Sequence, residues 1–242
     1  MKIACVIPAR FKSKRLPGKP LKNILGVPMI IRTAKQCLKV IKRVNLFVVT
    51  DDNRIINLCK KNNINAIKIK AKCLTGTDRV AQFAKNKNFT NYINVQGDEP
   101  ILNTKDLKKI ISFTKKNPNQ IFGGYCKIKN IKDYLNPSIP KVVFDNNKNL
   151  LYMSRASIPS NKKLKFIKGY KQIGIYSYPK KSLRKFITTK KQTPLEKMED
   201  IELLRFSEMN INIKMIEMSD KSISVDHPQD IKKVEKILKG KK

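Results

Sequence analysis

The loop that follows the first apolar run of the chain is rich in cations. Ile7–Leu21 reads IPARFKSKRLPGKPL and contains Arg10, Arg15, Gly18 and Lys19. A triphosphate spreads its charge over several oxygens, so it needs several cations together with backbone N–H donors. Gly18 would let the backbone approach such an anion closely. Arg10, Arg15 and Lys19 could therefore converge on one phosphate chain, although a solvated basic loop has the same composition.

Two acidic side chains far apart in the sequence could hold a metal ion. Asp98 lies in NVQGDEP (94–100), directly after an apolar run, and Asp226 lies in SVDHPQD (224–230), just before a helix start. Mg²⁺ is usually held by one or two carboxylates together with phosphate oxygens. If both segments end at the same edge of a sheet, Asp98 and Asp226 could share one Mg²⁺. Each Asp alone could equally form a turn or cap a helix.

A third polar stretch, LTGTDR (74–79), precedes a helical pattern. Thr75, Gly76 and Thr77 offer hydroxyl groups and a flexible backbone, which could contact the edge of a nucleobase. The same residues are also typical of a helix N-cap followed by an acidic residue. The sequence alone leaves both interpretations open.

These stretches need a frame of strands and helices to bring them together. Apolar runs alternate with amphipathic segments, which predicts strands and helices in β-α-β order and a mostly parallel sheet with helices on both faces. In such sheets ligands bind beyond the carboxyl ends of the strands. In the first half, the predicted strands are 2–7, 46–50, 66–69 and 92–95, and the predicted helices are 29–39, 54–61, 79–84 and 105–114.

The second half has a more mixed pattern. The predicted strands are 121–128, 142–144, 173–178 and 211–218, and the predicted helices are 183–188, 201–207 and 231–238. The polar, basic stretch 160–168 is expected to be a mobile loop. Because no Pro/Gly/Ser linker separates two halves, we expect a single α/β domain over 1–242 with a smaller mixed β lobe at roughly 125–210.

Composition indicates a cytoplasmic globular protein. The chain has 242 residues and is 40% apolar, enough for a real core, and it contains no apolar window long enough to cross a membrane. Its start does not resemble a signal peptide. The five cysteines form no CxxC pair, which favours free thiols in a reducing compartment over disulfides or a zinc site.

The formal net charge of +35 raises the question of nucleic-acid binding. The cations, however, are 44 Lys and only nine Arg, whereas nucleic-acid readers favour Arg for bidentate and stacking contacts. Lys is spread along the whole chain beside abundant Ile and Asn, residues that share A/T-rich codons. We therefore expect no specific nucleic-acid partner, while non-specific adhesion to polyanions is physically reasonable.

Taken together, the motifs resemble those of the CMP-sugar synthetases, and within them the 3-deoxy-manno-octulosonate (Kdo) cytidylyltransferase family. That family shows the same motifs in the same order over nearly the whole chain. Here they are IPARFKSKRLPGKPL (7–21), TGTDR (75–79), NVQGDEP (94–100), NPSIPKVV (136–143), SRASIP (154–159), GIYSY (174–178), PLE (194–196) and VDHPQD (225–230). The form ARFKSK of the first loop favours the Kdo branch over the synthetases for sialic-type sugars, which typically have ARGGSK.

The resemblance implies a Rossmann-like nucleotidyltransferase that joins CTP and Kdo to give CMP-Kdo and diphosphate for lipopolysaccharide synthesis. Arg10, Arg15 and Lys19 would then hold the triphosphate, and Thr75, Gly76 and Thr77 would face cytosine and ribose. Mg²⁺ on Asp98 and Asp226 would polarise the α-phosphate and lower the pKa of the attacking hydroxyl. Arg10, Lys19 and Asp98 are the expected catalytic residues.

On the sugar side, the resemblance places Gln96 near the reacting groups. Arg155 and Glu202 would contact the carboxylate and hydroxyls of the acid, and Lys141 would add a further contact. The resemblance also implies a homodimer formed through the 125–210 lobe.

Three positions depart from the family pattern. Gln172 stands where the family commonly has His, Leu203 replaces a polar residue after PLE, and Cys73 replaces a His before the GT loop. Gln172 can donate and accept hydrogen bonds but carries no charge, and Leu203 can do neither. If both residues contact the sugar, the substrate could be a related 2-keto-3-deoxy acid such as an amino-substituted Kdo or a nonulosonate.

Overall fold

A computed structural model describes residues 1–13, 15–189 and 191–240. Nine strands form one sheet, and a short hairpin, β2–β3, forms a second. The strands are β1 (Ile3–Ala9), β2 (Asn23–Ile24), β3 (Val27–Pro28), β4 (Leu46–Thr50), β5 (Ala66–Lys68), β6 (Asn91–Val95), β7 (Ile121–Lys127), β8 (Lys141–Phe144), β9 (Leu150–Ser154), β10 (Tyr170–Pro179) and β11 (Ile213–Glu217).

The helices lie between the strands in the order that the sequence pattern predicts. They are α1 (Met29–Leu38), α2 (Asn53–Lys61), α3 (Gly76–Lys85), α4 (Thr104–Lys116), α5 (Ile131–Leu135), α6 (Lys180–Thr188), α7 (Pro194–Glu199), α8 (Leu203–Glu208) and α9 (Pro228–Lys239). Two short 3-10 turns occur at Lys19–Leu21 and Arg43–Asn45.

The main sheet has the strand order β11-β7-β10-β6-β1-β4-β5. Strands β5, β4, β1 and β6 run parallel, as do β7 and β11. Strand β10 lies between these two groups and pairs antiparallel with β6 on one side and β7 on the other. β8 also pairs with β10, and β9 pairs with β8, which extends the sheet into the smaller lobe. The predicted mostly parallel α/β sheet is confirmed.

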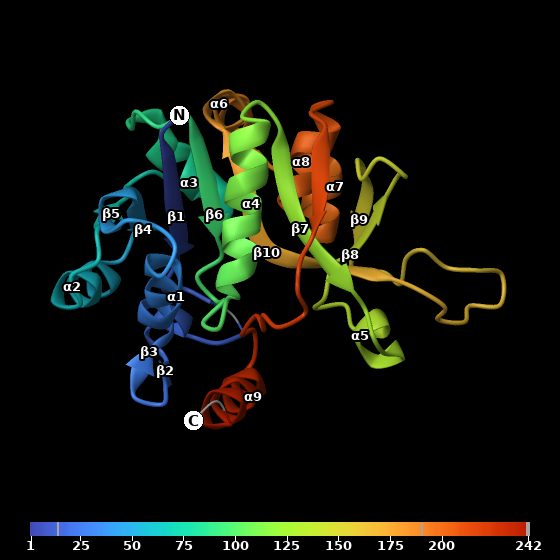
Figure 1. The fold of residues 1–242 in the computed structure, drawn as a ribbon, viewed down its shortest axis with the longest axis horizontal. Helices are drawn as coiled ribbons and strands as arrows, with labels where there is room; N and C mark the ends of the chain where they lie inside the picture. The colour runs from blue at the N-terminus through green and yellow to red at the C-terminus, as the bar shows by residue number, and fades with distance from the viewer. Residues whose placement is uncertain (14, 190, 241–242) are drawn as a thin grey trace.

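Helices cover both faces of the sheet (Figure 1). One core cluster includes Ile7, Ile30 and Ile110 and packs α1, α2 and α4 against one face. A second cluster includes Tyr92 and Phe206 and packs α3, α6 and α8 against the other face. Each large apolar side chain buried in this way contributes roughly 1.5–3 kcal/mol, so the two clusters fix the strands whose ends carry the polar loops.

The last helix, α9, lies beside the β2–β3 hairpin rather than on the sheet (Figure 1). A small third cluster joins Leu16 and Ile24 to Ile101, Val225 and Val234. The Val225 N–H donates to the Asp98 carbonyl over 2.9 Å. Residues near 20, 100 and 225 are therefore held side by side.

Most predicted elements lie where the periodicity placed them, and 46–50 coincides with β4. The 160–168 stretch forms no helix or strand, as expected. Cys5, Cys37, Cys59 and Cys126 are buried, and all five cysteines are free thiols. In the part of the chain that the structure describes, no helix is long and apolar enough to cross a membrane.

Candidate functional site

Two adjoining cavities open at the carboxyl ends of β1 and β6. The first, here called the basic cavity, has a volume of about 1040 Å³ and lies between the 8–20 loop and the 73–79 segment. The second, here called the lobe cavity, has a volume of about 610 Å³ and lies between β10, the β7–α5 segment and residues 220–233. Seven residues line both: Arg15, Gln96, Asp98, Arg155, Asp200, Glu202 and Asp226. The sequence therefore places a two-part site at the predicted edge of the sheet.

The basic cavity takes its cations from the loop after β1. Gly18 has a φ of +66°, a conformation that suits glycine, and its N–H donates to the Phe11 carbonyl over 3.2 Å. This bond closes the loop, and side chains of the loop, such as Arg10 and Arg15, line the cavity. Within the described part of the chain, Arg10 and Lys12 form no ion pair, although both line the cavity. Their charges are thus available to an anionic ligand.

Asp98 and Asp226 meet where the two cavities join. The Lys19 ammonium lies 2.6 Å from Asp98 Oδ2 and 3.1 Å from Asp226 Oδ1, and it also donates to the Val225 carbonyl. Arg15 contacts the same Asp226 oxygen over 2.8 Å. Burial lowers the pKa of Lys19, but the attraction of Asp98 and Asp226 outweighs it and the pKa is raised. The predicted triphosphate cation and the predicted metal carboxylates are therefore brought together.

The local sequence holds Asp226 in position. Pro228 occupies the first turn of α9, and the Asp230 carboxylate accepts the backbone N–H groups of Asp226 and His227 over 3.2 and 3.0 Å. Asp226 thus stands at the edge of a capped helix rather than in a mobile loop. This arrangement keeps its carboxylate beside Lys19 and Arg15.

The pair also fits a divalent cation. Two carboxylates already converge on one positive charge, the Lys19 ammonium. Among the described residues, no group of three His, Cys, Asp or Glu side chains could hold a metal ion by itself. A Mg²⁺ here would take the rest of its oxygen ligands from phosphate and water, which is usual for this ion.

The 74–79 stretch forms the wall of the basic cavity as a capped helix start. Thr75 is the N-cap of α3 in a capping box with Asp78, so the N-cap interpretation describes its local structure. Thr75 and Gly76 line the cavity. Thr77 is fully buried, and its hydroxyl contacts Glu202. Only the first two of these three residues therefore face a ligand in this cavity.

Glu202 lies behind this helix start and holds it. Its carboxylate accepts the N–H groups of Gly76 and Thr77 over 2.9 and 2.7 Å. Burial raises the pKa of Glu202, while the Thr77 hydroxyl and these two amides lower it in part. Because Glu202 also lines the lobe cavity, one side chain connects the walls of both cavities.

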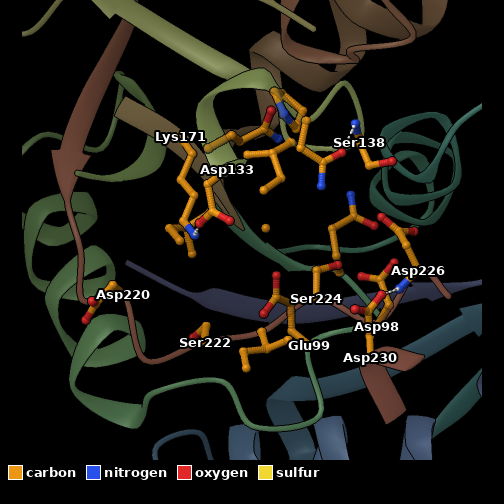
Figure 2. Close-up of a pocket in the computed structure, with 18 of the residues that line it drawn as sticks. Asp98, Glu99, Asp133, Ser138, Lys171, Asp220, Ser222, Ser224, Asp226 and Asp230 are labelled. Atoms are coloured by element: carbon orange, nitrogen blue, oxygen red, sulfur yellow. Dashed lines mark hydrogen bonds and ion pairs between the residues drawn. The ribbon is translucent and has the colours of Figure 1, made fainter. Parts of the chain in front are cut away.

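The lobe cavity carries more charges, most of them paired. Figure 2 shows Asp98, Asp226 and Asp230 gathered at one corner and the Asp133–Lys171 pair on the opposite side. Lys171 Nζ lies 3.2 Å from Asp133 Oδ2. Gln96 lines both cavities from the end of β6. This cavity therefore combines polar groups suited to a polyhydroxylated ligand of low net charge.

Arg155 and Lys141 are engaged with backbone carbonyls. Arg155 donates to the carbonyls of Glu199, Pro137 and Asp200, and it lines both cavities. Lys141 is fully buried and donates to the carbonyls of Asn136 and Arg155. Lys141 thus lies behind the cavity wall and supports Arg155 instead of facing the open space.

The three residues that depart from the family pattern lie in different surroundings. Leu203 is 1% exposed and packs in the core against Gly123, so it faces neither cavity. It therefore cannot contact the sugar, which was the condition for it to change the substrate. Gln172 does line the lobe cavity, where its amide nitrogen contacts the Tyr176 hydroxyl. Cys73 lines the basic cavity. Of the two residues suspected of changing sugar preference, only Gln172 is placed to do so.

Two buried charged residues of the site were missed by sequence analysis. Arg79 is 4% exposed, lines the basic cavity and pairs with Asp51 over 3.0 Å. Glu99 is 3% exposed and lines the lobe cavity. Burial, together with the neighbouring Asp98 charge, raises the pKa of Glu99 to about 8. Their place beside Asp78 and Asp98 was visible in the sequence, but their burial was not.

Comparison with known proteins identifies several similar proteins. A family model described as cytidylyltransferase matches residues 4–216. The chain is 38% identical to the 3-deoxy-manno-octulosonate cytidylyltransferase of Thermodesulfovibrio yellowstonii, covering 97% of both chains. It is 32% identical to the Escherichia coli protein of the same name, covering 98% of this chain and 96% of the other. The solved structure of a CMP:2-keto-3-deoxy-manno-octonic acid synthetase with CTP superposes with a TM-score of 0.91 at 30% identity, covering 100% of both chains.

Proposed function

The chain belongs to the 3-deoxy-manno-octulosonate cytidylyltransferases within the cytidylyltransferase family, and on that premise we propose how its two cavities divide the reaction. The enzyme is a nucleotidyltransferase that joins CTP and Kdo to give CMP-Kdo and diphosphate. CTP occupies the basic cavity and the sugar acid occupies the lobe cavity. The two substrates then meet at Asp98 and Asp226.

One observation carries this division. The unpaired cations Arg10 and Lys12 line only the basic cavity, whereas the carboxylates Asp98 and Asp226 lie at the junction of the two cavities. A triphosphate bound along the 10–19 loop would extend its α-phosphate toward that junction. The sugar hydroxyl can reach the same point only from the lobe cavity, opposite the departing diphosphate. This is the arrangement that in-line substitution at phosphorus requires.

The protein supplies positioning and charge in this scheme. Arg10, Arg15 and Lys19 bind the phosphate oxygens and stabilise the negative charge that grows on the diphosphate as the P–O bond breaks. Thr75 and Gly76 contact the nucleoside, and Glu202 fixes their position through α3. Gln96 lies between the substrates and orients the attacking hydroxyl.

We also propose that Asp98 and Asp226 hold Mg²⁺. When bound, Mg²⁺ would polarise the α-phosphate and acidify the sugar hydroxyl. Lys19 would then be released from the two carboxylates to contact phosphate. Support comes from the convergence of both carboxylates on a single ammonium group.

A related sugar acid is the second candidate substrate. Gln172 lines the lobe cavity, and its uncharged amide stands where the family commonly has His. An amino-substituted Kdo or a nonulosonate would contact the Gln172 amide in the same way as Kdo would. Arg155 and Lys171, which line the same cavity, would attract the carboxylate of any of these acids.

Diphosphate release by the purified protein tests the function. With Mg²⁺, CTP and Kdo we expect turnover, and none when the sugar is omitted. Turnover with an amino-substituted Kdo or a nonulosonate, but not with Kdo, would favour the second candidate. If no sugar acid supports turnover while the protein remains folded, the proposed function is wrong.

Finally, we propose that the 125–210 lobe forms a homodimer interface. Six exposed apolar side chains lie in it: Ile131, Leu135, Leu151, Leu164, Ile167 and Met198. Leu164 and Ile167, 82% and 80% exposed, lie on the loop between β9 and β10 that projects from the body in Figure 1. In light scattering, Leu164→Asp with Ile167→Asp should halve the mass of a dimer. Val44→Asp, at a 71% exposed site outside the lobe, should leave it unchanged.

A further inference from the structure

The floor of the lobe cavity contains a carboxylate without a hydrogen-bond donor. Glu99 is 3% exposed, and within the described part of the chain its Oε2 atom is buried without a partner. Figure 2 shows Glu99 between the Asp98–Asp226 corner and the Asp133–Lys171 pair. Its other oxygen, Oε1, is packed against Gly174: a Cβ added there would lie only 2.8 Å away. The carboxyl group is thus held firmly with one oxygen unused.

Burying a carboxyl group without a hydrogen-bond partner lowers the stability of the protein. An unsatisfied buried polar group commonly costs more than a hydrogen bond returns, and a charged one costs still more. The nearest carboxylates, Asp98 and Asp226, add repulsion, and Lys19 already contacts both of them. Among residues 1–13, 15–189 and 191–240, none supplies the missing donor, so a bound ligand could supply it.

A second acceptor on the same wall points to the same kind of ligand. The Oε1 atom of Gln172 is also buried without a partner, while its amide nitrogen contacts the Tyr176 hydroxyl. Gln172 and Gly174 are two residues apart on β10, and both line the lobe cavity. Two buried polar groups that line one cavity and lack partners suit a ligand with several hydroxyl groups.

We propose that Glu99 is a specificity-determining residue whose carboxyl group forms a hydrogen bond with a hydroxyl group of the sugar acid, with Gln172 Oε1 accepting a second. This inference rests on the proposed function, because it assigns the acid to the lobe cavity. Glu99 would select polyhydroxylated acids over short 2-keto acids, whose chains leave both acceptors unpaired. Such a site rejects a ligand without the hydroxyl more strongly than an apolar pocket could.

The test compares Glu99→Gln and Glu99→Ala with the wild type. We expect KM for the acid to rise roughly ten- to hundredfold in Glu99→Ala, and by less in Glu99→Gln, which keeps one acceptor oxygen. KM for CTP should stay within about twofold, since the basic cavity is untouched. Asp106→Asn is the matched control. Asp106 is likewise buried, at 5% exposed, but it lines neither cavity and Ser219 donates to both of its oxygens.

A second variant moves the carboxyl group without removing it. In Gly174→Ala the new Cβ would collide with Glu99 Oε1, so KM for the acid should again rise selectively. If Glu99 only supports the fold, Glu99→Gln would lower the melting temperature and leave KM for the acid unchanged. If it is a metal ligand, the Mg²⁺ dependence would shift instead. Either result overturns the inference while the wild type still turns over the acid; a wild type inactive with every sugar acid overturns the proposed function as well.

Discussion

The two cavities differ in how many of their own cations are paired with carboxylates. In the basic cavity, Arg10 and Lys12 stand without ion pairs among the described residues, on a loop closed by Gly18. In the lobe cavity, Lys171 is paired with Asp133 and Lys129 contacts Asp220, while Lys127 forms no ion pair within the described part of the chain. A triphosphate carries several charges, whereas a sugar acid carries one. Arg10 and Lys12 therefore leave two positive charges free in the cavity that would bind the polyanion.

The cavities also differ in how the chain builds them. The basic cavity comes mainly from two short segments, 8–20 and 73–79, each directly after or before a regular element. The lobe cavity combines β10 with residues near 130, 155 and 225. A local motif can therefore encode most of the first cavity, while the second depends on tertiary packing.

The largest expected effect comes from the junction of the two cavities. Asp98→Asn and Asp226→Asn should each lower kcat by about a hundredfold or more, because charge stabilisation at phosphorus is lost. Diphosphate release at saturating CTP and acid measures this. Asp145→Asn, in the turn between β8 and β9, is the control. Loss of only CTP affinity in either variant would place that carboxylate in the basic cavity alone.

Removing a free cation should affect only one substrate. Arg10→Ala should raise KM for CTP roughly tenfold, as expected for one charge-assisted contact to phosphate, and leave KM for the acid nearly unchanged. Initial-rate kinetics with each substrate varied in turn give both constants. Arg43→Ala, an exposed Arg outside both cavities, should behave as wild type. An equal rise in both constants would mean that the cavities are not separate.

Removing a cation that is already paired should raise KM less than removing a free one. Lys171→Met removes an ammonium group that Asp133 already neutralises, so KM for the acid should rise only about two- to fivefold. The same kinetic assay measures it, with Lys68→Met on the far edge strand as the control. A change as large as that in Arg10→Ala would show that Lys171 contacts the carboxylate directly, and the contrast between the cavities would fail.

The smallest expected effect is a change in the rate at which the Cys73 thiol is alkylated. Cys73 is the one cysteine that is not buried, and it lines the basic cavity. Burial of part of its surface raises the pKa of the Cys73 thiol, while Arg79 lowers it in part. Because the thiolate reacts, alkylation should accelerate about tenfold per pH unit as the pH rises toward that pKa.

Substrates should alter this rate differently. CTP should slow the alkylation of Cys73, and the sugar acid alone should not, as mass spectrometry of the peptide would show. Burial raises the pKa of Cys59 to about 12, so Cys59 should stay unmodified in the same sample. Equal protection by either substrate would contradict the assignment of CTP to the basic cavity.

The sequence predicted the frame more completely than the fine structure of the site. Strong periodicity located β4 and α4 to within two residues. Strand β9 was missed because its LLYMS sequence is half exposed at the edge of the lobe and shows no alternation. Helix α7 is only six residues long, too short for a 3.6-residue pattern to stand out.

The sequence also could not predict the direction in which individual side chains point. Leu203 follows Glu202 directly, yet the helix start turns one into the core and the other onto α3. Adjacent residues on a helix do not share a face, so a motif match cannot say which of them meets a ligand. The burial of Glu99 likewise depends on β10, a strand more than 70 residues later.

The position of β10 in the sheet has a consequence for the newly made chain. On the ribosome, β1, β4, β5 and β6 emerge first and can form a four-stranded parallel sheet, but Asn91–Val95 must wait for Ile175–Pro179 to pair with its open side. At about 5–20 residues per second that edge stays unpaired for some seconds. An unpaired central strand is a template for aggregation. Translation speed between residues 95 and 179 should therefore influence how much of this enzyme a cell recovers in folded form.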